Sequence, residues 1–389
     1  MVQSARHFES FEPHTLLKHA ILRAYEERWA RVLLARPDSR RTRVRIVDAC
    51  AGAGQDEIGN PGSPLISIRE AEKARAQLSA MRGAPVEVQV VAIEKDRGRF
   101  AQLEHVVGAF DGRHMAWCGT LGDYITRLEP DFPSTPTLFF IDPFGLDPLQ
   151  ADVVRRALRG SHNEVLLLFA DQAALRHIGA AAAMDAPDDA PLSLFDQEPE
   201  PPAPVPSRGL QLTAEAAVRI MNAAFGDERW RTAMNLPAER RRQKLVDVYA
   251  DLLQSMGAKR VLSLPMLGNR SRLKYHLMFA TKSGRGYEVM KDAVERAWNG
   301  DLVDDRAVQL MRLGVAAPIA SIEQEVRRRF AGRGHVPWTG TDPRSSVRVF
   351  ALQDTPAMPH QLEELKQRLA PLRVPGQGAV VYDFPPPRP

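Results

Sequence analysis

The sequence predicts an α/β fold in which a mainly parallel β-sheet is covered by helices on both faces. Two observations predict this class. Apolar segments with strand character alternate with segments of helical periodicity between residues 43 and 170, and the first of these strands runs into a glycine-rich turn. Because 389 residues exceed what one ordinary core accommodates, we also expect two domains.

The first half of the chain supplies the alternating elements in order. Leu17, Ile21 and Tyr25 recur at helical spacing, which predicts a helix over residues 14–35 that ends before Pro37. The strands that follow are expected at residues 43–48, 86–94, 114–118, 137–141 and 164–170, and the helices at residues 64–82, 95–110 and 149–159.

The later elements predict how the sheet closes. Two strand-like runs, residues 259–267 and 272–283, are joined by a short turn and therefore predict an antiparallel hairpin. A parallel series that closes with such a hairpin is typical of the Rossmann-like, seven-stranded methyltransferase sheet. Residues 180–208 are rich in Pro, Ala and acidic side chains, which predicts a disordered insert. Further helices are expected at residues 212–226, 240–257 and 286–298.

These elements divide the chain into a methyltransferase-like domain, residues 1–300, and a C-terminal module with a Pro-rich tail, residues 301–389. Three helices and a strand pair suit a winged-helix-like module. A small helical module that binds only protein has the same pattern and remains the alternative. The expected elements are helices at residues 322–330, 347–353 and 359–372 and a strand at residues 378–384.

Composition narrows the function classes. The chain has 52 Lys+Arg against 48 Asp+Glu, so its net charge of +4 does not by itself indicate nucleic acid. No apolar run reaches the roughly 20 residues of a membrane span, and the N-terminus lacks the apolar core of a signal peptide. We therefore expect a cytoplasmic protein without membrane association. Cys50 and Cys118 are too few for a zinc cluster, so we expect no metal and two reduced side chains inside the fold.

The first predicted strand ends in the segment that carries most of the functional argument. Asp48 is followed by small residues, among them Ala51, Gly52 and Gly54. Glycine lets the backbone turn sharply and approach a ligand, because no Cβ intervenes. This junction of a doubly wound sheet is where a nucleoside-type cofactor binds, so we expect these four residues to bind the cofactor, with Asp48 holding an amino group.

The second predicted strand ends in Glu94, with Lys95 beside it. A carboxylate at this place can accept hydrogen bonds from both ribose hydroxyls, and we expect these two residues to contact the cofactor. The alternative for Glu94 is a charge at a helix N-terminus. Asp123 follows the third strand and either accepts from an adenine amino group or caps the next helix.

The fourth predicted strand ends in Asp142, Pro143 and Phe144. A polar residue, a proline and an aromatic residue at this place are similar to the Asp/Asn-Pro-Pro-aromatic motif of amino-methyltransferases, although one proline is missing. The similarity implies that Asp142 accepts hydrogen bonds from a target amine and that the Phe144 ring stacks on a base. The alternative is a turn that begins a helix, in which Asp142 caps and Phe144 packs.

Basic residues supply candidate contacts to a substrate. Lys18 and His19 lie on the first predicted helix, either on its solvated face or as a basic lid over the cofactor. Arg240 and Arg241 begin one arginine triplet and Arg327 begins another, either as solvated helix faces or as phosphate-binding residues.

Several segments together resemble the three-Cys-motif partner protein (TcmP) family over residues 14–375. They are LLKHAILRAYEERW, VDACAGAG with GNPGSPL, AIEKD, FIDPFG, and YHLMFATKS followed by GYEVMKDA. The resemblance implies a bacterial protein with a methyltransferase-like domain and a winged-helix-like region, and a radical-SAM-like three-cysteine protein as its partner. The chain departs from the family at Cys50 and Ala53, where Phe and Pro are usual.

Three functions follow as hypotheses. The first is an S-adenosyl-L-methionine-dependent methyltransferase that acts on an amine of a nucleic acid. The second is a non-catalytic methyltransferase-like partner of the three-cysteine protein. The third is a dehydrogenase, which the late hairpin and the Asp-Pro-Phe turn disfavour.

Overall fold

The strand order defines the fold. The computed structural model describes residues 13–35, 40–110, 112–128, 134–185, 213–268, 271–300, 305–315, 317–370 and 380–385. Within them a seven-stranded sheet has the order β3-β2-β1-β4-β5-β7-β6, in which β1 to β5 are parallel and β7 is inserted antiparallel between β5 and β6. This is the sheet of class I methyltransferases, so the predicted fold class is confirmed. The strands are β1 (Arg43–Asp48), β2 (Glu87–Glu94), β3 (Met115–Cys118), β4 (Thr137–Ile141), β5 (Glu164–Phe169), β6 (Arg260–Leu267) and β7 (Leu273–Thr281).

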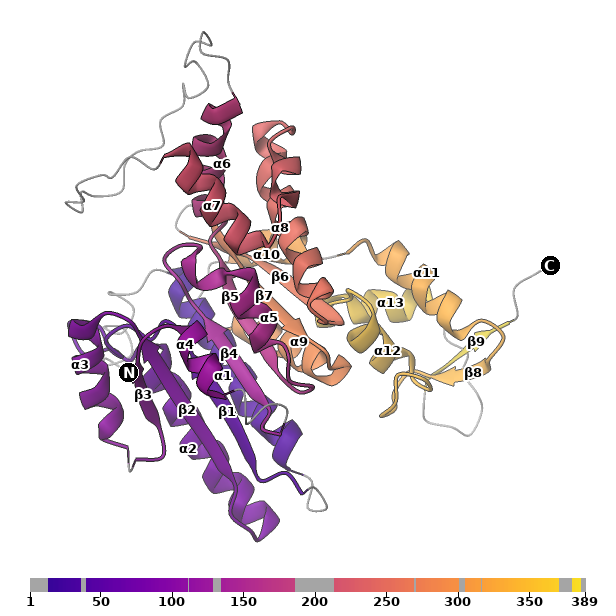
Figure 1. Ribbon diagram of the computed structural model, residues 1–389. Coiled ribbons are helices and arrows are strands. Elements are labelled where there is room, and N and C mark those ends of the chain that lie inside the picture. The colour runs from indigo at the N-terminus through magenta and orange to yellow at the C-terminus, as the bar shows by residue number, and fades with distance from the viewer. Residues whose placement is uncertain are drawn as a thin grey trace.

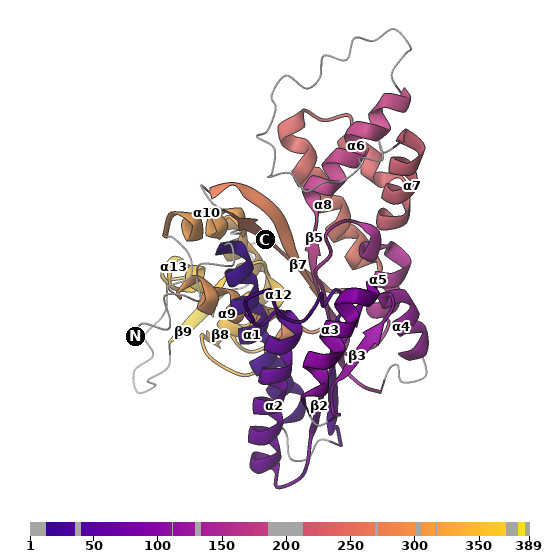
Figure 2. The same ribbon diagram turned by 90° about the vertical axis from the view of Figure 1, so that its left-hand side faces the viewer.

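Two helical layers enclose the sheet (Figures 1 and 2). Because successive side chains of a strand point to opposite faces, Leu138 and Phe140 join one buried cluster while Phe139 and Ile141 join the other. The first cluster contains side chains of α1 (Pro13–Leu34), α2 (Ser63–Arg82), α3 (Arg97–Gly108), α9 (Gly284–Trp298) and α10 (Asp305–Val315). The second contains side chains of α4 (Leu121–Leu128), α5 (Ala151–Ala157), α6 (Asp171–Asp185), α7 (Ala214–Phe225) and α8 (Ala238–Ser255), and of the short helices η3 (Asp147–Leu149) and η4 (Arg229–Ala233).

The chain reverses its direction of winding between β1 and β4, which are neighbours in the sheet although β2 and β3 lie between them in the sequence. From β1 the chain proceeds outward through β2 to β3, and from β4 it proceeds outward the other way. The carboxyl ends of β1 and β4 therefore lie at the topological switch point of the sheet, which is where open α/β sheets bind ligands.

The C-terminal module has a hydrophobic cluster of its own, drawn from residues between Ile322 and Phe384. Its elements are α11 (Ile319–Phe330), β8 (Gly334–Pro337), α12 (Val347–Asp354), η6 (Pro359–Gln361), α13 (Leu362–Arg368) and β9 (Val381–Phe384), and β8 pairs antiparallel with β9. The winged-helix-like assignment stays a prediction. Helix α10 belongs to the first cluster of the sheet, through Val308 and Met311, and not to this module.

Buried polar contacts join the module to the sheet domain beside α9 (Figure 1). Lys291 is fully buried, and its Nζ donates to the carbonyl oxygens of Leu352 at 2.9 Å and Thr355 at 2.8 Å. Arg260 pairs with Asp354 at the same boundary. These contacts fix α12 against α9.

The predicted insert at residues 180–208 is only partly described. Its first residues continue α6 as far as Asp185, and the prediction that residues 186–208 are disordered lies outside the described residues. Among the described helices, none combines the length and the apolar character that crossing a bilayer requires.

Candidate functional site

The glycine-rich loop after β1 has the backbone that the sequence predicts. Gly52 and Gly54 have φ angles of 60° and 85°, in the left-handed region that favours glycine. The Gly54 carbonyl accepts from Gly62 N at 2.9 Å, so the loop folds back to begin α2. A Cβ at Gly54 would meet Leu103 Cδ1 at 3.2 Å, whereas one at Gly52 would meet no atom within 4 Å. Gly52 therefore leaves open space in front of the loop.

Asp48 ends β1 and is completely buried. Its Oδ1 accepts from Cys50 N at 3.3 Å, whereas its Oδ2 has no hydrogen-bond partner among the described residues. Burial raises the pKa of Asp48 to about 7, and the charge of Asp142 adds to the rise, although the Ser63 side chain and the Cys50 amide oppose it. The site thus holds a carboxyl group that gains a charge near neutral pH and has a vacant acceptor oxygen.

Glu94 lies at the end of β2 and is 6% exposed. Its Oε1 accepts from Asp96 N at 2.8 Å and from Arg99 Nη2 at 3.0 Å. These contacts hold the carboxylate at the start of α3, as the helix-terminus alternative requires, while no hydrogen bond to Oε2 is seen in the described part of the chain. Lys95 is exposed and reaches Asp147 Oδ2 at 3.4 Å.

The carboxylates at the ends of three neighbouring strands lie together, because Asp48 of β1 pairs with Ala92 of β2 and Phe140 of β4, two residues before Glu94 and Asp142. The pKa of the Cys50 thiol is raised to about 12, first by burial and then by the negative charges of Asp48, Asp142 and Glu94. The thiol is therefore protonated and is no nucleophile at neutral pH. Cys118 is exposed, so the expectation that both cysteines lie inside the fold is wrong for it.

Asp142 follows β4 and forms an ion pair with Lys18 of α1. The side chains are 8% exposed for Lys18 and 21% for Asp142, so this is a largely buried contact and not part of a solvated helix face. His19 is the next residue, and its pKa is lowered to about 3 by burial and by the charges of Lys18 and Arg23. The lowered pKa favours the neutral imidazole, which disfavours the basic-lid alternative for His19.

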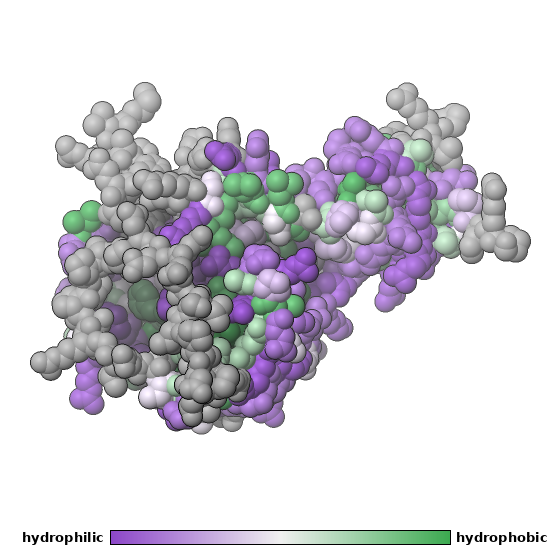
Figure 3. All heavy atoms as spheres, turned by 90° about the horizontal axis from the view of Figure 1, so that it is seen from above, coloured by the Kyte–Doolittle hydropathy of each residue, from purple (hydrophilic) through white to green (hydrophobic). Residues whose placement is uncertain are grey.

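The two residues after Asp142 differ in burial. Pro143 is buried, whereas Phe144 is 95% exposed. The alternative in which Phe144 packs into the fold is therefore wrong, and its ring is open to solvent at the carboxyl edge of the sheet. Figure 3 shows the molecule from above, with hydrophobic and hydrophilic residues side by side between the grey segments.

Asp123 lies in the first turn of α4 and not at its N-cap. Its Oδ2 accepts from the Thr120 hydroxyl at 2.7 Å and from Thr120 N at 3.3 Å, while Thr120 Oγ1 accepts from Asp123 N at 3.2 Å. This reciprocal pair is a capping box, and the Thr120 bonds lower the pKa of Asp123. The helix begins at Leu121, three residues before the start that the N-cap alternative implies, and Asp123 is the third residue of its first turn. Its hydrogen bonds to Thr120 account for the position of this carboxylate.

In the described part of the chain, no contact is seen between the candidate arginines and the glycine-rich loop. Arg241 Nε donates to Leu236 O at 2.8 Å, and Arg240 is exposed at the start of α8. Arg327 lies in the separate C-terminal module, where it pairs with Glu323 at 2.9 Å. The third residue of the first triplet, Arg242, instead approaches the carboxyl edge of β5, which sequence analysis did not anticipate.

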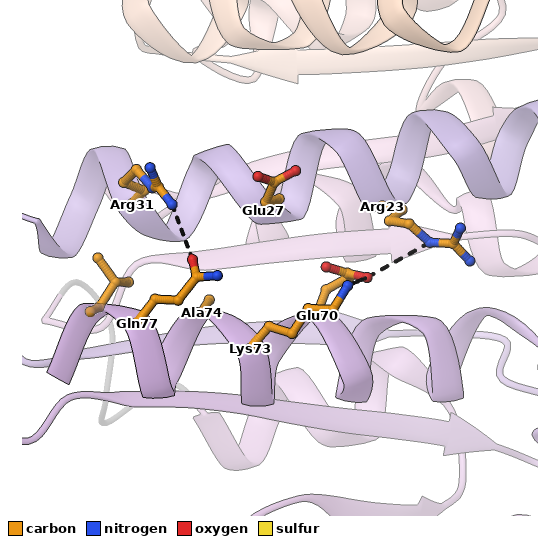
Figure 4. Close-up of a pocket in the computed structure, with 8 residues that line it drawn as sticks. Arg23, Glu27, Arg31, Glu70, Lys73, Ala74 and Gln77 are labelled. Atoms are coloured by element: carbon orange, nitrogen blue, oxygen red, sulfur yellow. Dashed lines mark hydrogen bonds and ion pairs between the residues drawn. The ribbon is translucent and has the colours of Figure 1, made fainter. Parts of the chain in front are cut away.

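A charged groove of about 270 Å³ runs between α1 and α2 (Figure 4). Glu70 lies between two cations, with Arg23 Nε at 3.8 Å and Lys73 Nζ at 2.9 Å. Arg31 donates to Gln77 at 3.1 Å across the same groove. Its three cations, Arg23, Arg31 and Lys73, outnumber its two carboxylates, Glu27 and Glu70, by one, so the groove has a formal net charge of +1 (3 − 2). In the described part of the chain, no cluster of three or more His, Cys, Asp or Glu side chains is arranged to hold a metal ion.

The strand order, the glycine loop and the converging carboxylates define a class I methyltransferase fold. No protein-family model and no curated protein matches the sequence. Solved structures that resemble it include the cyclopropane synthase MmaA2 from Mycobacterium tuberculosis, with 13% identity, a TM-score of 0.25 and coverage of 72% of this chain and 70% of that one. Another is a loganic acid methyltransferase with SAH, with 9% identity, a TM-score of 0.31 and coverage of 78% and 87%. Because these TM-scores are low, the assignment of the class I methyltransferase fold depends on the strand order of the sheet.

Proposed function

We propose that this chain is a methyltransferase that uses S-adenosyl-L-methionine. The observation that carries the proposal is the convergence of Asp48, Asp142 and Glu94 at the carboxyl ends of the neighbouring strands β1, β4 and β2, at the switch point of the sheet. The alternative of a dehydrogenase lacks support, because a dinucleotide-binding sheet does not require the antiparallel β7 between β5 and β6.

The residues at the switch point fit this cofactor. The buried Oδ2 of Asp48 lacks a donor, which an amino group would supply. Gly52 leaves the loop backbone accessible, and Glu94 offers Oε2 to ribose hydroxyls. The cofactor supplies a methyl group already activated by a sulfonium, so the protein has to position the acceptor and exclude water.

For the acceptor we propose an amine of a nucleic acid base. The exposed Phe144 ring offers a stacking surface, and Asp142 offers an acceptor oxygen for an amino group beside it. The ion pair with Lys18 fixes the orientation of the Asp142 carboxylate, which accepts hydrogen bonds.

Titration calorimetry with S-adenosylhomocysteine tests the cofactor, and a tritiated methyl donor incubated with total cellular RNA, DNA and protein tests the acceptor. We expect saturable binding and label in one nucleic acid fraction. Absence of binding to the full chain would overturn the proposal. Label confined to protein would overturn the acceptor class only.

One observation favours a second candidate, a non-catalytic methyltransferase-like partner of a radical-SAM-like three-cysteine protein, as the resemblance to the TcmP family implies. The ion pair with Lys18 engages Oδ2 of Asp142, so only one oxygen of this carboxylate is left for an acceptor amine. For this candidate we expect co-purification with a co-expressed three-cysteine protein and no methyl transfer by either protein alone.

A further inference from the structure

The C-terminal module carries a group of exposed arginines where α11 ends. Arg328 and Arg329 lie in the last turn of this helix, Arg333 immediately precedes β8, and Arg344 lies in the loop between β8 and α12. Figure 1 shows β8 and β9 at the outer end of the module, away from the seven-stranded sheet. We call these four residues the arginine surface.

Two aromatic rings bring the arginines of this surface together. The Arg329 guanidinium lies over the Phe350 ring, 5.7 Å from its centroid, and the Arg333 guanidinium lies 5.9 Å from the centroid of the Phe330 ring. The two rings pack edge to face with centroids 5.5 Å apart. Arg333 Nη1 also donates to the Arg344 carbonyl oxygen at 2.8 Å. These contacts connect two separate segments of the chain into one surface.

The charge of the arginine surface is not neutralised within the module. In the described part of the chain, no ion pair is seen for any of its four members. Two carboxylates lie beside it: Asp342, whose Oδ1 accepts from Arg344 N at 2.8 Å, and the exposed Asp383 of β9. Four guanidiniums against two carboxylates leave a formal charge of +2 (4 − 2).

A purely structural role accounts for only part of this surface. Cations are favoured at a helix C-terminus, which explains Arg328 and Arg329 but not Arg333 and Arg344, which lie outside the helix. Stacking on a ring uses the face of a guanidinium, whereas its five N–H donors lie in its plane. Among the described residues, no hydrogen bond from the Arg329 guanidinium is seen. The rings therefore hold the guanidiniums in place while donors stay available.

We propose that the arginine surface binds the phosphodiester backbone of a nucleic acid. A guanidinium donates two parallel hydrogen bonds to phosphate oxygens, and its stacking on a ring reduces the entropy lost on binding. A nucleic acid strand presents one negative charge per roughly 3.4 Å, so several phosphates reach a surface of this size together. Backbone contacts carry no sequence information, so we expect affinity to be independent of sequence. The inference goes beyond methyl transfer, because it needs neither cofactor nor turnover.

The salt dependence of binding tests the inference. Fluorescence anisotropy of labelled RNA, single-stranded DNA and duplex DNA is measured with the full chain from about 50 to 200 mM NaCl. Four phosphate contacts predict a slope of log affinity against log salt of roughly −3 for a single strand and −4 for a duplex. The three probes distinguish which nucleic acid is bound.

Substitutions then assign the slope to the arginine surface. The triple variant Arg329→Met, Arg333→Met and Arg344→Met should reduce the magnitude of the slope by roughly 2 to 3. Each single substitution should reduce it by about 1, so the test does not depend on the folding of the triple variant. The three corresponding Lys substitutions keep the charge, so they should keep most of the slope and bind more weakly, because lysine lacks the planar fork.

Arg327→Met is the matched control. Arg327 belongs to the same triplet, but its Nε pairs with Glu323 at 2.9 Å and its Nη2 donates to the Arg368 carbonyl oxygen at 3.1 Å. We therefore expect this variant to keep the wild-type slope. Urea unfolding of each variant checks that the module remains folded.

The outcomes separate this inference from the proposed function. An affinity that does not change with salt, or Met variants that keep the wild-type slope, would overturn the inference. Polyglutamate that displaces the probes as well as unlabelled nucleic acid does would assign the surface to an acidic protein instead. Because the assay contains no methyl donor, a chain that binds nucleic acid in this way but does not bind S-adenosylhomocysteine refutes the proposed function alone.

Discussion

Lys18 of α1 forms an ion pair with Asp142, the residue that follows β4, across 124 positions of sequence. The contact ties the first helix to the switch point of the sheet, and Asp142 in turn raises the pKa of Asp48 at the end of β1. A helix that sequence analysis could interpret only as a solvated face or a lid is thus part of the candidate site.

We expect Lys18→Met to lower methyl transfer by about tenfold or more, because it removes a charge-assisted bond and leaves Asp142 partly buried without its cation. Kinetics of methyl transfer and calorimetry of S-adenosylhomocysteine binding check this. The cofactor affinity should change less than the rate. Arg23→Met, at a cation of the α1–α2 groove that is 56% exposed, is the control on the same helix, and an equal loss of rate in it would refute a specific role for Lys18.

Asp48 predicts a pH dependence of cofactor binding. An ammonium group binds the ionised carboxylate, and the pKa of Asp48 is raised to about 7. Affinity for S-adenosylhomocysteine should therefore increase as pH rises from 6 to 8. Calorimetry across this interval checks it. Asp48→Asn should bind more weakly at pH 8 with a flatter profile, and a wild-type profile in this variant would remove Asp48 from the site.

The same carboxyl group predicts a pH dependence of stability. Because its pKa is higher in the folded chain than in the unfolded chain, the folded state binds more protons between about pH 4 and 7. The contribution of Asp48 to the free energy of unfolding is therefore most favourable below the pKa that this group has in the unfolded chain. It falls as pH rises through about 7, by roughly 1.4 kcal/mol per pH unit between the two pKa values. Urea unfolding checks this: the free energy of unfolding of Asp48→Asn should fall less steeply with rising pH than that of the wild type.

Glu26 is a second buried carboxyl group with a raised pKa, and it serves as the comparison for the stability measurement on Asp48. It is buried, and its pKa is raised to about 8, first by burial, with the Ser67 hydroxyl bond at 2.7 Å opposing the rise. Glu26→Gln keeps the size and an oxygen that accepts from Ser67. We expect this variant to be more stable than the wild type above pH 8 and to bind S-adenosylhomocysteine normally, which distinguishes a structural carboxyl from that of Asp48.

Phe144→Ala should separate binding of the acceptor from stability. The ring is 95% exposed, so its removal should change the free energy of unfolding by less than about 0.5 kcal/mol. If the ring stacks on a base, KM for the nucleic acid should rise, since such stacking is worth about 1–3 kcal/mol per base. Phe144→Tyr keeps the ring and should retain the wild-type KM. An unchanged KM in Phe144→Ala would exclude stacking.

Lys291→Met should loosen the C-terminal module. The variant leaves the Leu352 and Thr355 carbonyls without their donor, and a buried unsatisfied group costs about 1–3 kcal/mol. We expect a lower unfolding midpoint and faster amide exchange in α12. Arg296→Met changes an exposed cation of the same helix and should have little effect.

The sequence by itself determined the sheet class, because hydrophobic periodicity and the hairpin after the parallel strands are local patterns. It also located Asp48, the two glycines, Glu94 and Asp142, since the carboxyl ends of parallel strands meet at one edge. The same rule could have identified Asp171, which lies two residues after the end of β5.

Only the tertiary structure decided which side chains face one another. The Lys18–Asp142 pair joins a helix to a distant strand end, and the contact between Asp171 and His276 depends on the position of the antiparallel β7 beside β5. The physical reason is that ionisation and proton position depend on burial and on charges a few ångströms away, and those neighbours come from elements far apart in the chain.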